Sequence, residues 1–81
     1  MKKLKVYSAS WCGTCKMVKP TINKLIKEDF DIEVIDLDKN QEEAIANNVN
    51  NVPTFILYDN NVEQGRVSGI PTENDIRGWF D

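Results

Sequence analysis

Strand and helix patterns alternate along this chain, and no other feature limits the possible folds as strongly. Segments 3–8, 32–37, 54–58 and 62–67 alternate apolar with polar residues or form short apolar runs, which predicts four strands. Apolar residues at helical spacing predict helices over 14–28 and 41–48, and a last helix is capped by Thr72. The order β-α-β-α-β-β-α predicts an α/β fold with one mixed four-stranded sheet flanked by three helices.

The apolar run Val34-Ile35 in the second predicted strand suggests burial on both faces, as in a parallel pair. The turn at 59–61, Asp-Asn-Asn, predicts an antiparallel hairpin, because Asn and Asp accept left-handed backbone angles. A length of 81 residues leaves room for one small core, so residues 1–81 are expected to form a single domain.

Charge and composition exclude several function classes. The net charge is -3 without a basic face, which argues against nucleic-acid binding. The longest apolar run, Phe55 to Tyr58, is too short to span a membrane, and the first residues do not resemble a signal peptide. We therefore expect a cytoplasmic protein. Histidine is absent, which removes the commonest general base and the commonest zinc ligand.

The only two cysteines, Cys12 and Cys15, lie where the first strand ends and the first helix begins. Unpaired N–H groups at a helix N-terminus stabilise a thiolate, so Cys12 is expected to be a reactive nucleophile. Cys15, one turn further along, is expected to be more buried and close enough to form a disulfide. Gly13 permits close approach of a partner, and Lys16 adds a nearby positive charge.

Other interpretations of the cysteine pair are open. A zinc site would need two further ligands from another chain, which means a zinc-bridged dimer. A structural disulfide would close a very short loop and stabilise little. Two inert buried cysteines would make their placement at a strand–helix junction a coincidence. The position favours a redox function.

The hexapeptide of residues 11–16, Trp-Cys-Gly-Thr-Cys-Lys, resembles the active-site motif of the thioredoxin family, usually Trp-Cys-Gly-Pro-Cys-Lys. Pro20 resembles the proline of the active-site helix, and segment 52–54, Val-Pro-Thr, resembles the cis-proline segment. Gly69 resembles the glycine beside the substrate groove. The length is that of glutaredoxins and of short redoxins that supply ribonucleotide reductase, whose Ser-Gly-Phe segment is similar to 68–70.

The resemblance implies a role for each of these residues. Cys12 would attack a substrate disulfide and Cys15 would resolve the mixed disulfide, leaving a Cys12–Cys15 bridge as the only redox group, with no bound cofactor and no metal. A cis Val52–Pro53 bond would free the Val52 backbone to pair with substrate. The implied supporting residues are Trp11, Gly13, Thr14, Lys16 and Pro53, and the implied groove residues are Val52, Thr54 and Gly69.

Two positions depart from the family pattern. The buried aspartate that helps deprotonate the resolving thiol falls on Val6, so resolution is expected to be slower or shifted to higher pH, and the sequence names no replacement acid. Thr14 replaces proline between the cysteines, which is expected to make the reduction potential somewhat more oxidising than the ~-270 mV of thioredoxin.

The resulting expectation is a monomeric protein disulfide oxidoreductase, recharged by a flavoenzyme resembling thioredoxin reductase. Its substrates would be protein disulfides, with ribonucleotide reductase as a candidate. One alternative is a glutaredoxin, although the family's Thr-Val-Pro is Asn-Val-Pro at 51–53 and its Gly-Gly pair is Ser-Gly at 68–69. Another is a non-catalytic binding module on the same fold.

Overall fold

The computed structural model describes residues 1–81, and its elements follow the predicted order with one short addition. The elements are β1 (Lys2–Ser8), α1 (Gly13–Lys27), β2 (Ile32–Asp36), the 3₁₀ turn η1 (Leu37–Lys39), α2 (Gln41–Ala46), β3 (Thr54–Asp59), β4 (Val62–Ser68) and α3 (Glu73–Trp79). Helix α1 continues through Pro20 without a break. The prediction of a mixed sheet with three α-helices is confirmed. None of these helices combines the length and the apolar character needed to cross a bilayer.

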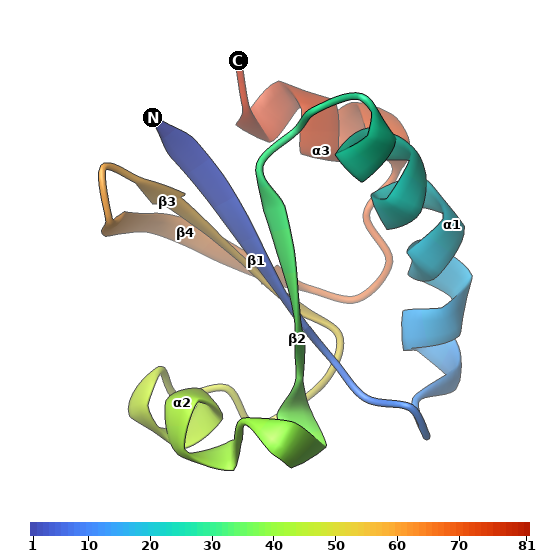
Figure 1. Cartoon of the computed structure of the whole chain (residues 1–81), viewed down its shortest axis with the longest axis vertical. Coiled ribbons are helices and arrows are strands. Elements are labelled where there is room, and N and C mark those ends of the chain that lie inside the picture. Colours follow the sequence, from blue (N-terminus) through green and yellow to red (C-terminus); the bar gives the residue numbers. More distant parts are fainter.

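The four strands form one sheet in the order β2-β1-β3-β4. β1 runs parallel to β2, from Leu4 opposite Ile32 to Ser8 opposite Asp36, whereas β3 is antiparallel to both β1 and β4. Helices α1 and α3 cover one face and α2 covers the other (Figure 1). The parallel β1–β2 pair brings the C-terminal ends of both strands to the same edge of the sheet, where α1 begins.

Each face of the sheet has its own apolar core. The core under α1 and α3 comprises Leu4, Val6, Val18, Ile22, Leu25, Phe55 and Ile76. The core under α2 comprises Tyr7, Ile35, Ala44, Val49 and Ile56. Trp79 and Phe80, at the end of the chain, pack against the first core. Because the side chains of β1 alternate between the two faces, the strand that leads to the cysteines contributes residues to both cores.

The prediction that β2 is buried on both faces is wrong. Val34 is 50% exposed, whereas its neighbour Ile35 is buried under α2. The physical reason is the strand order: β2 is an edge strand with a neighbour on one side only. A short apolar run has the same appearance in an edge strand and in a central one.

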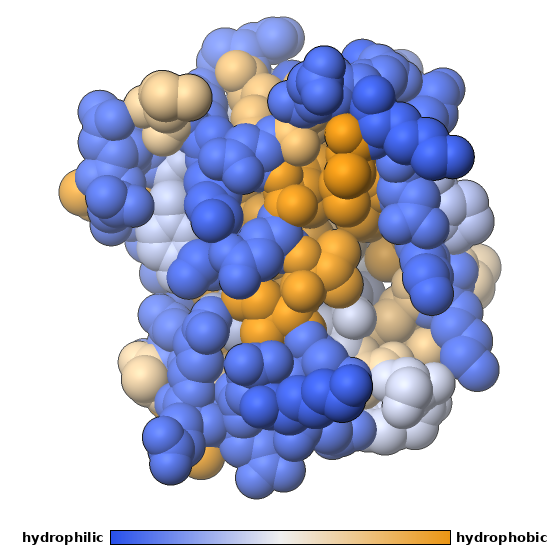
Figure 2. Space-filling model, in the orientation of Figure 1, coloured by the Kyte–Doolittle hydropathy of each residue, from blue (hydrophilic) through white to orange (hydrophobic).

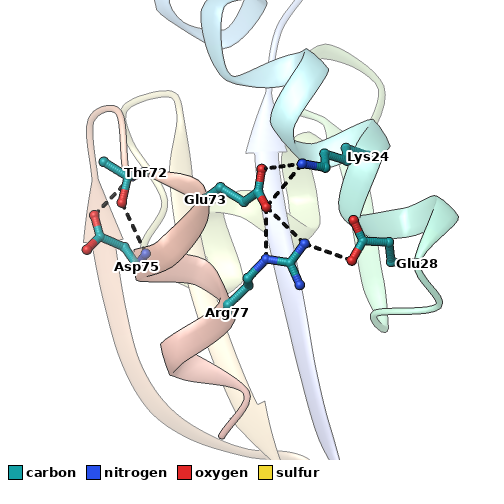
Figure 3. A network of polar contacts seen from close by, with 6 residues as sticks. All are labelled: Lys24, Glu28, Thr72, Glu73, Asp75 and Arg77. Carbon is teal, nitrogen blue, oxygen red and sulfur yellow. Dashed lines mark hydrogen bonds and ion pairs between the residues drawn. The ribbon is translucent and has the colours of Figure 1, made fainter.

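The predicted hairpin and helix cap are both present. Asn60 and Asn61 join β3 to β4 with φ values of 52° and 69°, the left-handed angles that asparagine tolerates. At the start of α3, the Asp75 N–H donates to the Thr72 hydroxyl over 3.1 Å. In return, the Thr72 N–H donates to the Asp75 carboxylate over 2.9 Å (Figure 3).

Charged side chains join α3 to α1 beyond the shared core. Glu73 accepts from the Lys24 ammonium at 3.0 Å and from the Arg77 guanidinium at 2.9 Å (Figure 3). Arg77 also reaches Glu28 at 2.7 Å, just beyond the end of α1. The network links the last helix to the helix that carries Cys15.

Thr72→Ala is expected to lower the free energy of unfolding by about 1 kcal/mol, because α3 loses its side-chain cap. For a chain of this size the midpoint of thermal unfolding should fall by about 4–8 °C. Circular dichroism during heating measures the change. Thr72→Ser keeps the hydroxyl and is the control; equal midpoints for the alanine and serine variants would show that the cap contributes nothing.

Candidate active site

The two cysteines occupy the first turn of α1, as the sequence predicted. Cys12 is the N-cap residue, with an extended backbone (φ -91°, ψ 114°), and its Sγ accepts a hydrogen bond from the Cys15 N–H at 3.1 Å. The Thr14 hydroxyl lies 3.3 Å from the same sulfur. Both cysteines are free thiols. The Cys12 sulfur therefore takes the place of the oxygen that usually caps a helix, facing its positive end.

The two cysteine residues are equally accessible, each only 6% exposed, but burial acts more strongly on the Cys15 thiol, whose pKa it raises. They form a small apolar cluster with Ala9, against which Leu37 and Val52 pack.

The environments of the two thiols displace their pKa values in opposite directions. Burial alone would raise the pKa of Cys12, but hydrogen bonds from the Cys15 thiol, the Thr14 hydroxyl and the N–H groups of both residues bring it below its ordinary value. Burial, followed by the hydrogen bond with Cys12, raises the pKa of Cys15 to about 11. One thiol is thus prepared to ionise while the other retains its proton.

Thr14→Val is expected to raise the pKa of Cys12, because valine keeps the shape of threonine but has no hydroxyl to stabilise the thiolate. The rate of iodoacetamide alkylation should then rise with pH at a higher midpoint than in the wild type. Mass spectrometry of Cys12 in a Cys15→Ser background measures the profile. Thr14→Ser, which retains the hydroxyl, is the control, and coincident valine and serine profiles would contradict the assignment.

Trp11 lies on the surface beside the cysteines and is held there by a carboxylate. Its indole is 64% exposed, and its Nε1–H donates to Asp38 Oδ2 at 3.0 Å. Asp38 belongs to η1, directly after β2. No sequence pattern indicates this contact between residues 27 positions apart, because the parallel β1–β2 pair creates it.

The segment before β3 lies against Cys12. The Val52–Pro53 peptide bond is cis, Pro53 is buried, and the Val52 carbonyl lies 3.7 Å from Cys12 Sγ. The Val52 N–H has no hydrogen-bond partner within the chain. Thr54 differs from its expected role: it is 3% exposed, and its hydroxyl donates to the Asn51 carbonyl at 2.7 Å, so this side chain anchors the loop and does not line a groove.

The remaining predicted residues are more loosely connected to the thiols. Gly69 follows β4 and has a φ of 104°, an angle that favours glycine. Ser68, the last residue of β4, pairs with Thr54. A Cβ on Gly13 would meet no atom within 4 Å, so packing within the chain does not require glycine there. The Lys16 ammonium is exposed and forms no ion pair.

Val6, at the position of the family's buried acid, lies in the core and lines a hollow of about 480 Å³ that also reaches Cys15. Only one carboxylate, that of Asp36, lines this hollow. No three His, Cys, Asp or Glu side chains come together as metal ligands would.

Comparison with known proteins agrees with this geometry. The family model described as thioredoxin matches residues 2–81. The chain belongs to the thioredoxin family. It is 35% identical over 69 residues to thioredoxin from Ophiophagus hannah and 31% identical over 75 residues to thioredoxin from Mycoplasma genitalium. These matches cover 83% and 90% of the chain, respectively.

Solved structures of family members share the fold. A mutant thioredoxin from Halobacterium salinarum superposes with a TM-score of 0.88 at 32% identity, covering 95% of this chain and 69% of that one. The chain spans 66% of the Ophiophagus protein, 74% of the Mycoplasma protein and 49% of thioredoxin H2 from Arabidopsis thaliana. It therefore matches only part of the length of these thioredoxins.

Proposed function

We propose that this chain is a thiol–disulfide oxidoreductase that reduces protein disulfides through Cys12 and Cys15. The observation that carries the proposal is the pair of thiols in the first turn of α1, with the pKa of Cys12 lowered and that of Cys15 raised. Membership of the thioredoxin family supports the same activity.

The reaction requires only these two side chains. The Cys12 thiolate attacks one sulfur of the substrate disulfide, a mixed disulfide forms, and the first substrate sulfur leaves as a thiolate that takes up a proton. Cys15 then loses its proton and attacks the Cys12 sulfur. The second substrate thiol is released, and the two electrons lost by the Cys12–Cys15 pair have reduced the substrate. The dithiol is itself the redox group, so no cofactor or metal enters the reaction.

The substrate chain would lie beside the segment before β3. The unpaired Val52 N–H offers a hydrogen bond to an extended peptide next to Cys12, in the manner of an added strand. Exposed Trp11 and the surface near Gly69 would flank that peptide, and Gly13 would leave room for its approach. Lys16, the residue after Cys15 on α1, would add a positive charge near the resolving thiol.

The second step is expected to be the slower one. Val6 supplies no acid–base group, and Cys15 starts from a pKa of about 11, so proton loss from Cys15 becomes easier as the pH rises. The rate of attack by Cys12 should stop rising with pH once Cys12 is ionised. The rate of resolution by Cys15 should continue to rise at pH values well above that point.

For its physiological setting, we propose a cytoplasmic monomer that receives electrons from a flavoenzyme of the thioredoxin-reductase type. Ribonucleotide reductase is one candidate substrate, based on chain length and the Ser68-Gly69 segment. Asn51, which replaces the threonine of glutaredoxins, and Ser68-Gly69, which replaces their Gly-Gly pair, favour such a flavoenzyme over glutathione as the electron donor.

Insulin reduction tests the activity. With dithiothreitol as electron source, the protein should accelerate precipitation of the insulin B chain well beyond dithiothreitol alone. Thioredoxin reductase with NADPH should sustain turnover, whereas glutathione with glutathione reductase should not. Efficient turnover with glutathione alone would assign the chain a glutaredoxin function, and no acceleration with any donor would leave a non-catalytic binding role.

A further inference from the structure

The outer edge of β2 has no partner in the chain. β2 pairs only with β1, so alternate N–H and C=O groups of the strand point away from the sheet. Its central side chain, Val34, is half exposed and apolar. The opposite edge strand, β4, is less suited to pairing, because a register shift interrupts its ladder with β3 and a Glu63–Arg66 ion pair lies along it.

A hollow of about 480 Å³ lies between this free edge and α1. Its apolar lining includes Val6 from β1, Val18 and Ile22 from α1, and Val34 from β2, and Cys15 is also part of its wall. In Figure 2, the apolar surface in the middle of the molecule continues into a recess beside the hydrophilic residues over α1. Cys12 does not line this hollow.

The α1 side of the hollow is positively charged. Helix α1 contains four lysines and no acidic residue, in a chain whose net charge is -3. Lys24 is paired with Glu73, but Lys16 and Lys19, which line the hollow, form no ion pair. The one lining carboxylate, on Asp36, accepts from the Asp38 N–H at 2.9 Å.

We propose that this groove between β2 and α1 docks an extended segment of a partner protein whose α1-facing side chains are apolar and acidic. The segment would pair with the free edge of β2 as an added strand. Every second side chain of a strand faces the same side of the sheet, so these residues would meet α1. The apolar ones would enter the hollow over Val34, and the acidic ones would reach Lys16 and Lys19.

This docking site is separate from the substrate surface beside Cys12, and it does not depend on the proposed redox activity. A segment bound there would lie behind Cys15 and leave Cys12 uncovered. A partner could therefore be held by the groove while its disulfide, or another protein's, is exchanged at Cys12.

Titration of the ¹⁵N-labelled protein with the end-blocked peptide Thr-Val-Thr-Glu-Thr-Val-Thr-Glu tests the proposal by NMR. Saturable shifts are expected in the amides of β2 and of the first half of α1. Val34→Lys and Lys19→Gln should each weaken binding about tenfold. The matched controls are Val62→Lys on the β4 edge and Lys27→Gln at the far end of α1, and both should bind as the wild type does.

Several results would overturn the proposal: no saturable shift at about 1 mM peptide, equal binding when lysine replaces glutamate in the peptide, or shifts centred on β4. Sedimentation showing a dimer that Val34→Lys dissociates would assign the groove to a second copy of the chain. Tighter binding of a single-stranded oligonucleotide at the same amides would assign it to a polyanion. Since the titration involves no electron transfer, its outcome is independent of the insulin assay.

Discussion

Cys12→Ser is expected to abolish disulfide reduction, with a loss of roughly 10³-fold or more in turnover. Serine has no thiolate to attack the substrate, and Cys15 cannot replace it, because burial holds the pKa of Cys15 at about 11. Cys15→Ser should behave differently. Cys12 can still attack, but nothing resolves the product, so a mixed disulfide with substrate should accumulate.

Insulin turbidity measures the loss of turnover, and non-reducing electrophoresis detects the trapped adduct. The Cys12→Ser variant should remain folded, because a serine oxygen is a good N-cap for α1; thermal unfolding is the control. Activity retained by the Cys12→Ser variant, or adducts formed by it and not by Cys15→Ser, would reverse the roles of the two thiols.

Val6→Asp is expected to destabilise the chain by about 3 kcal/mol or more at neutral pH, a large share of the roughly 4–12 kcal/mol typical for this length. Val6 is buried in the core under α1 and α3, and every member of that core is apolar. Adding the family's acid at this position would therefore place an unpaired carboxylate in the core.

The penalty should depend on pH. Burial raises the carboxyl pKa in the folded state above its unfolded value of about 3.9, so stability is retained below about pH 4 and lost as the pH rises through the folded-state pKa. Urea unfolding at acidic and at neutral pH measures this change. Val6→Asn has no titrating group, and its penalty should not follow that trend. Equal penalties at both pH values for Val6→Asp would show that the added carboxyl is hydrated in the hollow.

Local chemistry made most of the fold predictable. The strand patterns, the Asn60-Asn61 turn and the Thr72–Asp75 cap depend on neighbours in the sequence, and the structure contains all of them. The exposure of Val34 depends on which strand lies at the edge of the sheet, and the apolar run around it carries no information on that point.

The same distinction applies to the site. The motif of residues 11–16 identified the thiols and the start of α1, because helix capping is local. The partner of Trp11 was not predictable, since Asp38 reaches it only through the parallel pairing of β1 with β2. Thr54 was expected in the groove from the resemblance alone, but strand alternation and its bond to Asn51 turn it inward.

The bond from the Trp11 indole to Asp38 has a consequence for recognition. A large aromatic side chain on a surface normally loses rotamer freedom when another molecule packs against it, and that loss weakens association. Here the hydrogen bond to Asp38 already restricts the ring beside the thiol pair. A protein that binds beside the thiols would contact an apolar ring that is already oriented. The entropy cost of ordering Trp11 on binding should therefore be smaller, and the affinity correspondingly higher.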